Sequence, residues 1–314
     1  MLKSRLLVIL VAFISSSSYA ATDAKTCSPV DLRGEKLGPV RNQDSMGACY
    51  AFSSADLLSY KMGHKISAMS LMRSKAKTWY LSILDKLSLQ SRHGQLMSGG
   101  NEKPLLDQAL KAGLCLEKDL PSEDNLNVEY RDRIEALYKL KSSVEKKEVT
   151  HYDACIQLLT LFPAIEPNDA IAILINSDLN SLFDRLAEKS CYWKIKAPSL
   201  KIVSEKKIFL LDKLFPTDLF STINRELSRK NPPIIGYVGK VLVDIETTKT
   251  NISHSSLIVG RKFNPASQTC EYLVRNSWGR SCSYYDSRLK CEEGHIWLPE
   301  NILGKKLNEV VYAK

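Results

Sequence analysis

The sequence has few features of a membrane protein or of a nucleic-acid-binding protein. After its first 20 residues, the 314-residue chain has no apolar run long enough to cross a bilayer, which needs about 20 residues. Its formal net charge is +9, but the basic residues form no polybasic block and do not alternate with aromatic residues. Internal repeats are also absent. We therefore expect no nucleic-acid partner, no stable membrane insertion, and a chain long enough for a sizeable core.

The N-terminus has the features of a cleavable signal peptide. Lys3 and Arg5 precede an apolar run at residues 6–14, and the small residues Ser18 and Ala20 occupy the two positions that a signal peptidase reads. The apolar run is too short for a membrane span. We expect cleavage after Ala20 and a secreted or periplasmic protein. An uncleaved anchor or an attached lipid is the alternative.

Histidine is scarce, and cysteine supplies the candidate nucleophile. The chain has five histidines and eight cysteines. In an exported chain, cysteines are more often half-cystines than reactive thiols. If Cys49 is free, the others are odd in number and cannot all pair within one chain. Proximity in the sequence favours pairing Cys155 with Cys191, Cys282 with Cys291, and then Cys27 with Cys115, which leaves Cys270 over.

Periodicity predicts a helical first half. Apolar residues recur at helical spacing from Cys49 to about Met62, and Gly63 ends the pattern. A second helix fits residues 104–111. Residues 124–198 contain no glycine and are rich in lysine, glutamate, leucine and isoleucine, which predicts two to four further helices. Two of these are expected at residues 130–144 and 169–187.

The second half of the chain is β-rich. One helix is expected at residues 217–228, and turn residues separate several short runs of β-branched and aromatic residues. Helices followed by strands predict an α+β protein of two lobes with a cleft between them. The expected strands are residues 234–238, 241–245, 256–259, 272–275 and 295–298.

A reactive cysteine is expected where a glycine-containing loop meets a helix. Cys49 follows Gly47 and stands at the start of the first predicted helix. The first-turn amides and the positive end of the helix dipole stabilise a thiolate, which is the attacking species in thiol chemistry. The run Gly-Ala-Cys-Tyr also fits the end of the pattern Cys-Gly-[Ser/Ala]-Cys-[Trp/Tyr] found around nucleophilic cysteines, with Met46 at the place of the first cysteine.

Four blocks of the sequence resemble the papain-like family of cysteine peptidases, in the order in which that family has them. Residues 30–33 (VDLR) resemble the mature N-terminus, and residues 43–52 (QDSMGACYAF) resemble the nucleophile block. Residues 253–260 (SHSSLIVG) resemble the strand that presents the catalytic histidine, and residues 276–279 (NSWG) resemble the asparagine block. The resemblance leaves the middle helical segment unmatched.

The resemblance implies a papain-like α+β fold with a helical left lobe, a β-barrel-like right lobe and the active site in the cleft between them. Residues 21–314 would form this one domain after the signal peptide at residues 1–20. His254 follows Cys49 by roughly 200 residues, whereas the family pattern has about 130–150. A helical insertion at about residues 124–198 would account for the excess.

The resemblance also implies roles for individual residues. Cys49 would attack the scissile carbonyl, His254 would take or hold the thiol proton as imidazolium, and Asn276 would orient the imidazole. Gln43 would donate to the oxyanion together with the backbone N–H of Cys49. Trp278 would cover the histidine and asparagine pair. No metal or organic cofactor is implied, and the expected partner of this monomer is a protein or peptide substrate.

Gly99 and Gly100 are expected to bind substrate. In the family, a disulfide joins the cysteine three residues before the nucleophile to one that precedes a Gly-Gly pair, and here Met46 and Met97 hold these two positions. Two thioethers would fill the space of the missing bridge. Without side chains, Gly99 and Gly100 would let an extended peptide hydrogen-bond to the backbone of Gly100. A plain turn is the other interpretation.

Two further features indicate a divergent bacterial member of the family. Only nine residues, Ala21 to Pro29, separate the predicted cleavage site from the first block, so we expect no inhibitory N-terminal prosegment. A glycosylation sequon at residues 251–253 directly precedes His254, and a glycan there would crowd the active site. The sequon is harmless in a cell that leaves such sequences unglycosylated.

Three functions are compatible with this pattern. The first is an exported peptidase that hydrolyses peptide bonds with a cysteine, histidine and asparagine. The second is a thiol amidase or transpeptidase that acts on peptidoglycan peptides with the same three residues. The third is a binding protein that keeps the peptidase scaffold without turnover. Because all four residues of the expected catalytic machinery are intact, the sequence favours an enzyme.

Overall fold

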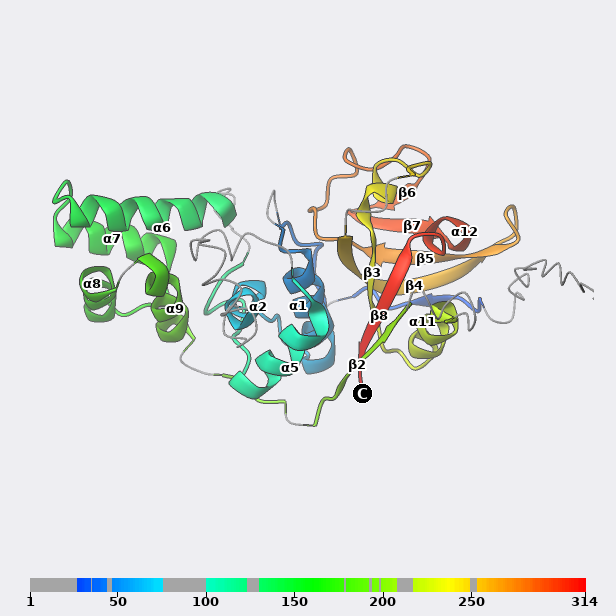
Figure 1. Cartoon of the computed structure of the whole chain (residues 1–314), viewed down its shortest axis with the longest axis horizontal. Helices are drawn as coiled ribbons and strands as arrows, with labels where there is room; N and C mark the ends of the chain where they lie inside the picture. The colour runs from blue at the N-terminus through cyan, green and yellow to red at the C-terminus, as the bar shows by residue number, and fades with distance from the viewer. Residues whose placement is uncertain are drawn as a thin grey trace, which may run out of the picture.

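The protein consists of helices packed against an antiparallel sheet, as shown in the computed structural model of Figure 1. The predicted α+β class is therefore confirmed. The structure describes residues 27–34, 36–43, 47–75, 100–122, 130–177, 179–191, 194–197, 199–207, 217–248 and 253–314. The predicted signal peptide lies outside these ranges. Within them, no helix has the length and apolar character that crossing a bilayer requires.

The sheet has the strand order β2-β8-β3-β4-β5-β7-β6, and the short strand β1 pairs with β4. Its strands pair antiparallel throughout the described registers. Four of the predicted strands lie within β3, β4, β5 and β7. The strands are β1 (Val30–Asp31), β2 (Ile202–Lys206), β3 (Ile234–Val238), β4 (Ser253–Asn264), β5 (Thr269–Arg275), β6 (Lys290–Glu292), β7 (His295–Pro299) and β8 (Leu307–Ala313).

The strand predicted at residues 241–245 is wrong. The chain forms the 3-10 helix η1 (Gly239–Leu242) there and then turns. Val241 and Leu242 are both fully buried in the same core. A strand would direct two neighbouring side chains to opposite faces, whereas a helical turn can bury both. The apolar run alone did not distinguish these two cases.

The two faces of the sheet belong to two different hydrophobic cores. Successive residues of a strand point to opposite faces. In β4, Leu257 and Val259 therefore pack with the helices that precede the sheet, whereas Ile258 packs on the other side. Helices α11 (Leu219–Ser228) and α12 (Glu300–Leu303) contribute to this second core. The sheet thus separates the two cores.

Helix α1 (Cys49–Met62) packs against β4 and has the predicted bounds. Its middle is buried on most sides, from Tyr50 to Ser59, because it lies between the sheet and the other helices. Gly63 ends the helix with a left-handed φ of 70°, a conformation that glycine adopts without strain. Ala48 precedes the helix and provides no side-chain cap. The first-turn amides therefore remain for other acceptors.

Two further helices complete the core around α1. Helices α2 (Ala68–Lys75) and α5 (Glu102–Ala112) pack against α1 and against each other. The side chain of Asn101 caps α5 by accepting a hydrogen bond from the backbone N–H of Lys103 at 3.3 Å. This cap explains why α5 begins before the predicted position at residue 104.

Four helices form a separate group beside α2 at the end of the molecule away from the sheet (Figure 1). They are α6 (Tyr130–Glu145), α7 (His151–Leu161), α8 (Pro167–Asn176) and α9 (Leu179–Ser190). The single helix predicted at residues 169–187 is wrong, since the chain leaves helical geometry at Ser177 between α8 and α9. Pro167 at the start of α8 suits the first turn of a helix.

The segment that enters the four-helix group and the segment that leaves it lie next to each other. The backbones of Leu114 and Ile195 exchange hydrogen bonds of 2.8 and 2.9 Å. A disulfide joins Cys115, just after α5, to Cys191, just after α9. The segment between them is therefore closed at its base.

The three disulfides of the described chain correct two of the predicted pairings. Cys282–Cys291 is confirmed. The pairs Cys155–Cys191 and Cys27–Cys115 are wrong, because Cys191 and Cys27 bond to Cys115 and Cys270 instead. Cys155 is a buried free thiol within the four-helix group. Proximity in sequence fails here because the partners are 76 and 243 residues apart.

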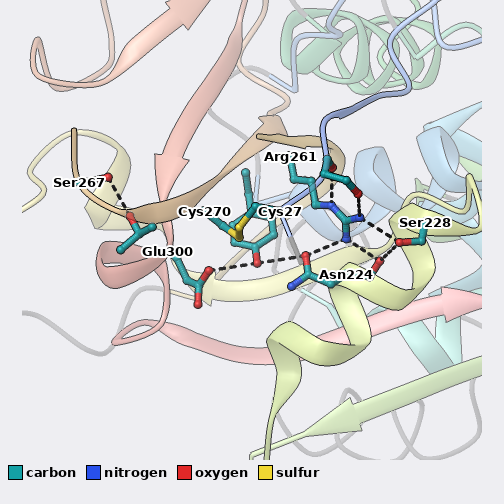
Figure 2. The surroundings of a disulfide bond; sticks show 10 residues. Cys27, Asn224, Ser228, Arg261, Ser267, Cys270 and Glu300 are labelled. Atoms are coloured by element: carbon teal, nitrogen blue, oxygen red, sulfur yellow. Dashed lines mark hydrogen bonds between the residues drawn. A yellow bond between two sulfur atoms is a disulfide. The ribbon is translucent and has the colours of Figure 1, made fainter. Parts of the chain in front are cut away.

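The Cys27–Cys270 disulfide attaches the N-terminal segment to the sheet (Figure 2). Beside it, Arg261 of β4 donates to the carbonyl of Ser28 at 2.9 Å and to the carbonyl of Asn224 at 2.7 Å. Arg261 thus connects three segments around the bridge, namely the N-terminal segment, β4 and α11. Three disulfides are typical of proteins that fold outside the reducing cytoplasm, and the chain is accordingly extracytoplasmic.

A buried carboxylate connects α1 to two other segments. Asp56 of α1 accepts hydrogen bonds from Arg41 at 2.7 Å and from Arg275 at 2.9 Å. The three residues are 3%, 1% and 2% exposed. Burial raises the pKa of Asp56, but Arg275 and Arg41 outweigh it and hold the pKa below its usual value. This ion triad holds together the segments that carry the candidate site.

We expect the Asp56→Asn variant to lose about 3–5 kcal/mol of unfolding free energy, because it removes the carboxylate that pairs with the buried Arg275 and is the nearer of the two carboxylates paired with Arg41. Urea denaturation followed by circular dichroism measures the change. Asp107→Asn is the control, since Asp107 pairs with Lys103 on the exposed surface of α5 and its loss should cost under about 0.5 kcal/mol. Equal stability of the two variants would contradict a stabilising role of the triad.

Candidate active site

Cys49 is the first residue of α1 and lies against the start of β4. The backbone N–H groups of Ser255, Tyr50 and Cys49 itself lie close to its sulfur and favour the thiolate. Two of these amides belong to the uncapped first turn of the helix. The third comes from the residue that follows His254. Cys49 is not disulfide-bonded and remains partly accessible to solvent.

His254 and Asn276 are hydrogen-bonded to each other. The distance from His254 Nε2 to Asn276 Oδ1 is 2.7 Å. His254 is the second residue of β4, and Asn276 directly follows β5, the neighbouring strand. They are 7% and 1% exposed. Because Nε2 donates to the amide oxygen, the other ring nitrogen, Nδ1, carries the lone pair that can accept a proton.

A glycine leaves room for the imidazole. A Cβ atom on Gly239 would lie only 2.4 Å from the Cβ atom of His254. Any other residue at this position would therefore displace the histidine or the 3-10 helix. The ring of Tyr237, in register with His254 on β3, meets the imidazole edge-on at 5.6 Å between centroids.

Trp278 also packs against the imidazole. Its ring centroid is 5.2 Å from that of His254. The backbone of the same segment pairs with the residues before α1, because Gln43 N–H donates to Ser277 O at 2.7 Å and Gly279 N–H donates to Arg41 O at 2.9 Å. This pairing brings Gln43 and Trp278 to the same part of the molecule as the histidine.

The orientation of the Gln43 amide is fixed by Ser277. The Ser277 hydroxyl donates to Gln43 Oε1, and the glutamine is only 5% exposed. The oxygen end of the amide is therefore occupied, and the NH₂ end carries the donors that an oxyanion would need. The structure thus brings Cys49, His254, Asn276, Gln43 and Trp278 to one part of the molecule.

Gly100 lies near the nucleophile, and Gly99 lies outside the described residues. A Cβ atom on Gly100 would be 2.6 Å from the ring of Tyr50, the residue after Cys49. Gly100 therefore lets the loop before α5 pack directly on this aromatic ring. Its backbone is exposed beside the start of α1.

Burial keeps the thiol and the imidazole uncharged at neutral pH. It raises the pKa of Cys49 to about 11, with a further contribution from the negative charge of Glu102. Burial also lowers the pKa of His254 to about 4, and the hydrogen bond to Asn276 only partly opposes this effect. Burial therefore opposes a charge on either group.

Glu102 is a buried carboxylate close to Cys49 that the sequence did not predict. It is 7% exposed at the start of α5, and its pKa is raised by burial although a hydrogen bond from the Ser255 hydroxyl lowers it. Ser255 also bonds the Ser53 hydroxyl of α1 at 2.7 Å. These polar contacts join α1, α5 and β4 next to the thiol.

The chain is similar to solved structures of cysteine proteases. A ragweed pollen cysteine protease in its proform matches with a TM-score of 0.50 at 15% identity, over 91% of this chain and 64% of that protein. The fold is that of papain-like cysteine proteases. A cysteine protease of Carica candamarcensis in complex with E-64 gives a TM-score of 0.48 at 16% identity, over 91% of this chain and 97% of that one. Procathepsin L2 from the larval midgut of Tenebrio molitor gives a TM-score of 0.49 at 14% identity, over 91% of this chain and 67% of that one.

The likeness is one of fold and not of sequence. No family model matches the chain, and no curated protein matches it. The chain spans less than two thirds of the length of the ragweed proform. The chain therefore shares the papain-like fold with the ragweed protein at only 15% sequence identity.

Sequence reasoning missed several residues around the papain-like site. Tyr285 accepts a hydrogen bond from Asn276 Nδ2 at 3.1 Å, and Ser256 donates to Asn276 Oδ1 at 3.2 Å. Ser256 was recognisable, because it stands two residues after the histidine on the same strand and so on the same face. Tyr285 had no such signal, since it lies in the loop closed by Cys282 and Cys291. In the described ranges no His, Cys, Asp or Glu group is placed to hold a metal ion.

The variant Glu102→Gln should lower the pKa of Cys49, because it removes the negative charge that disfavours the thiolate. The rate of alkylation by iodoacetamide as a function of pH, with the modified residue identified by peptide mass mapping, reports this pKa. Asp107→Asn removes the same charge from an exposed position on the same helix. If both variants shift the alkylation profile equally, Glu102 has no specific effect on the thiol.

Proposed function

We propose that the protein is an exported cysteine peptidase that hydrolyses peptide bonds with Cys49, His254 and Asn276. The observation that carries the proposal is the buried His254 Nε2 to Asn276 Oδ1 hydrogen bond of 2.7 Å. His254 lies on β4, and the backbone N–H of the next residue, Ser255, lies close to the Cys49 sulfur and favours the thiolate. The papain-like fold supports the proposal, because the ragweed protein of the same fold is a cysteine protease.

In the first half of the reaction, the sulfur of Cys49 attacks the carbonyl carbon of the scissile amide. The thiol proton moves to Nδ1 of His254, and Asn276 stabilises the imidazolium through Nε2. Gln43 Nε2 and the backbone N–H of Cys49 donate to the oxyanion. The imidazolium then gives its proton to the leaving nitrogen, the C–N bond breaks, and a thioester remains on Cys49.

In the second half, His254 takes a proton from water as the water oxygen attacks the thioester carbon. The C–S bond breaks, the carboxylic acid leaves, and the proton returns to the sulfur of Cys49. Burial favours the neutral pair in the free protein. Proton transfer during attack therefore suits this site better than a stable thiolate and imidazolium pair.

The proposal extends to the organisation and location of the chain. Residues 1–20 would be a signal peptide cleaved after Ala20, and residues 21–314 would form one peptidase domain in the periplasm or outside the cell. Residues 124–198 would be a helical insertion, which the closed base at Cys115 and Cys191 supports. The enzyme would act as a monomer on proteins or peptides, without a metal, a cofactor or nucleic acid.

We expect the mature protein to hydrolyse casein or a peptide library and the Cys49→Ala variant to be inactive, because the nucleophile is gone. A thiol-directed epoxide should label Cys49 and abolish turnover. Cys155→Ala is the matched control, since Cys155 is a buried free thiol in the four-helix group and its loss should leave activity unchanged.

Each other result identifies a different function. Equal hydrolysis by wild type and Cys49→Ala would end the peptidase assignment. Labelling of Cys49 with turnover of murein fragments but not of casein would identify a thiol amidase or transpeptidase. A Cys49 that neither labels nor turns over any of these substrates would identify a binding protein.

Replacing Gln43 by alanine should lower kcat by about 10²–10³ and leave KM nearly unchanged, because it removes a donor that acts on the transition state. Steady-state kinetics on one peptide substrate measure both constants. Asn42→Ala is the control, because Asn42 is an adjacent amide residue on the exposed side of the segment. A loss confined to KM, or an equal loss in both variants, would contradict the oxyanion role.

A further inference from the structure

The Asn276 amide depends on its neighbours for its orientation. The terminal torsion of an asparagine side chain is broad and roughly two-fold, so the backbone alone does not hold the amide plane. Here Oδ1 accepts from His254 at 2.7 Å and from Ser256 at 3.2 Å. The Nδ2 end donates to the hydroxyl of Tyr285 at 3.1 Å. Tyr285 is thus the described partner on the side of the amide that faces away from His254.

Tyr285 also supports Trp278, the residue that covers the imidazole. Its ring stacks on Trp278 with 5.6 Å between centroids and 9° between planes. Trp278 in turn lies 5.2 Å from His254. Tyr285 is only 8% exposed, so both contacts are shielded from water. Tyr285 therefore supports the His254 and Asn276 pair in two ways, through a hydrogen bond to Asn276 and through its stack on Trp278.

The loop around Tyr285 is anchored on both sides. The Cys282–Cys291 disulfide closes it. The next residue, Asp286, donates its backbone N–H to Leu242 O at 2.8 Å and accepts from the backbone N–H of Ile245 at 3.1 Å. These bonds hold the position of Tyr285 against the segment that contains η1.

We propose that Tyr285 is a positioning residue for the reaction, which keeps the Asn276 amide in place so that Asn276 can hold the His254 imidazole toward Cys49. The inference rests on the proposed function. Tyr285 contacts neither the sulfur nor the reacting ring nitrogen, and it acts through Asn276 and Trp278. A residue with this role affects kcat and the order of the imidazole more than substrate binding.

The loop supplies a matched pair of tyrosines for the test. Tyr285→Phe removes the hydroxyl and keeps the ring stack. Tyr284→Phe makes the same chemical change one residue earlier, where the side chain is 61% exposed. We expect Tyr285→Phe to lower kcat about three- to tenfold, the worth of one hydrogen bond, with KM unchanged. Tyr284→Phe should match the wild type.

A double-mutant cycle separates positioning from a general structural effect. If Tyr285 acts through Asn276, adding Tyr285→Phe to Asn276→Ala should cost no further activity, because the amide that it holds is already gone. A full three- to tenfold loss in the Asn276→Ala background would overturn the proposal. So would equal kinetics of Tyr284→Phe and Tyr285→Phe.

A readout without turnover keeps this inference distinct from the proposed function. With ¹⁵N-labelled histidine and the Cys49→Ala chain, NMR can follow the His254 Nε2–H proton, assigned with a His254→Gln variant. We expect this proton to exchange with solvent faster after Tyr285→Phe and at the wild-type rate after Tyr284→Phe. Unchanged exchange would overturn the positioning role even if the protein proves to be a peptidase. Faster exchange would support it even if no substrate is hydrolysed.

Discussion

The site depends on one buried carboxylate. Asp56 lies between two guanidinium groups, and each of the three residues belongs to a segment that leads into the site. Arg41 is two residues before Gln43, Asp56 is two turns along the helix that begins at Cys49, and Arg275 directly precedes Asn276. Three buried charges cost a large desolvation energy unless every partner is in place. The same requirement fixes the three segments relative to one another.

A second constraint follows from this burial. The sulfur and the imidazole lie where charge is disfavoured, which raises the pKa of one and lowers the pKa of the other. A resting thiolate is then unfavourable, although three backbone amides surround the sulfur. These amides stabilise the charge that develops during attack, when the histidine takes the proton. The helix N-terminus therefore stabilises the negative charge of the transition state more than it stabilises a thiolate in the free protein.

The sequence predicted local features well and distant contacts poorly. Both ends of α1 were predicted, because apolar spacing and a left-handed glycine are encoded within a few residues. The four sequence blocks predicted the papain-like fold through resemblance, and the catalytic roles that they imply stay predictions. Periodicity could not predict that Cys27 pairs with Cys270, or that a charged residue in an apolar helix, Asp56, meets Arg275. Such partners lie hundreds of positions apart, and only the folded chain brings them together.

The backbone and the side chain of Asn276 are held by different interactions. The ion triad fixes its backbone, since the preceding Arg275 also donates to the carbonyls of Leu37 and Gly38. A fixed backbone still leaves the amide free to turn about its last torsion. Side chains alone restrict this torsion. Ser256 of β4 donates to the amide oxygen, and Tyr285 of the disulfide-closed loop accepts from the amide nitrogen. The loop between Cys282 and Cys291 belongs to none of the four blocks recognised in the sequence, yet it contributes a direct contact to Asn276.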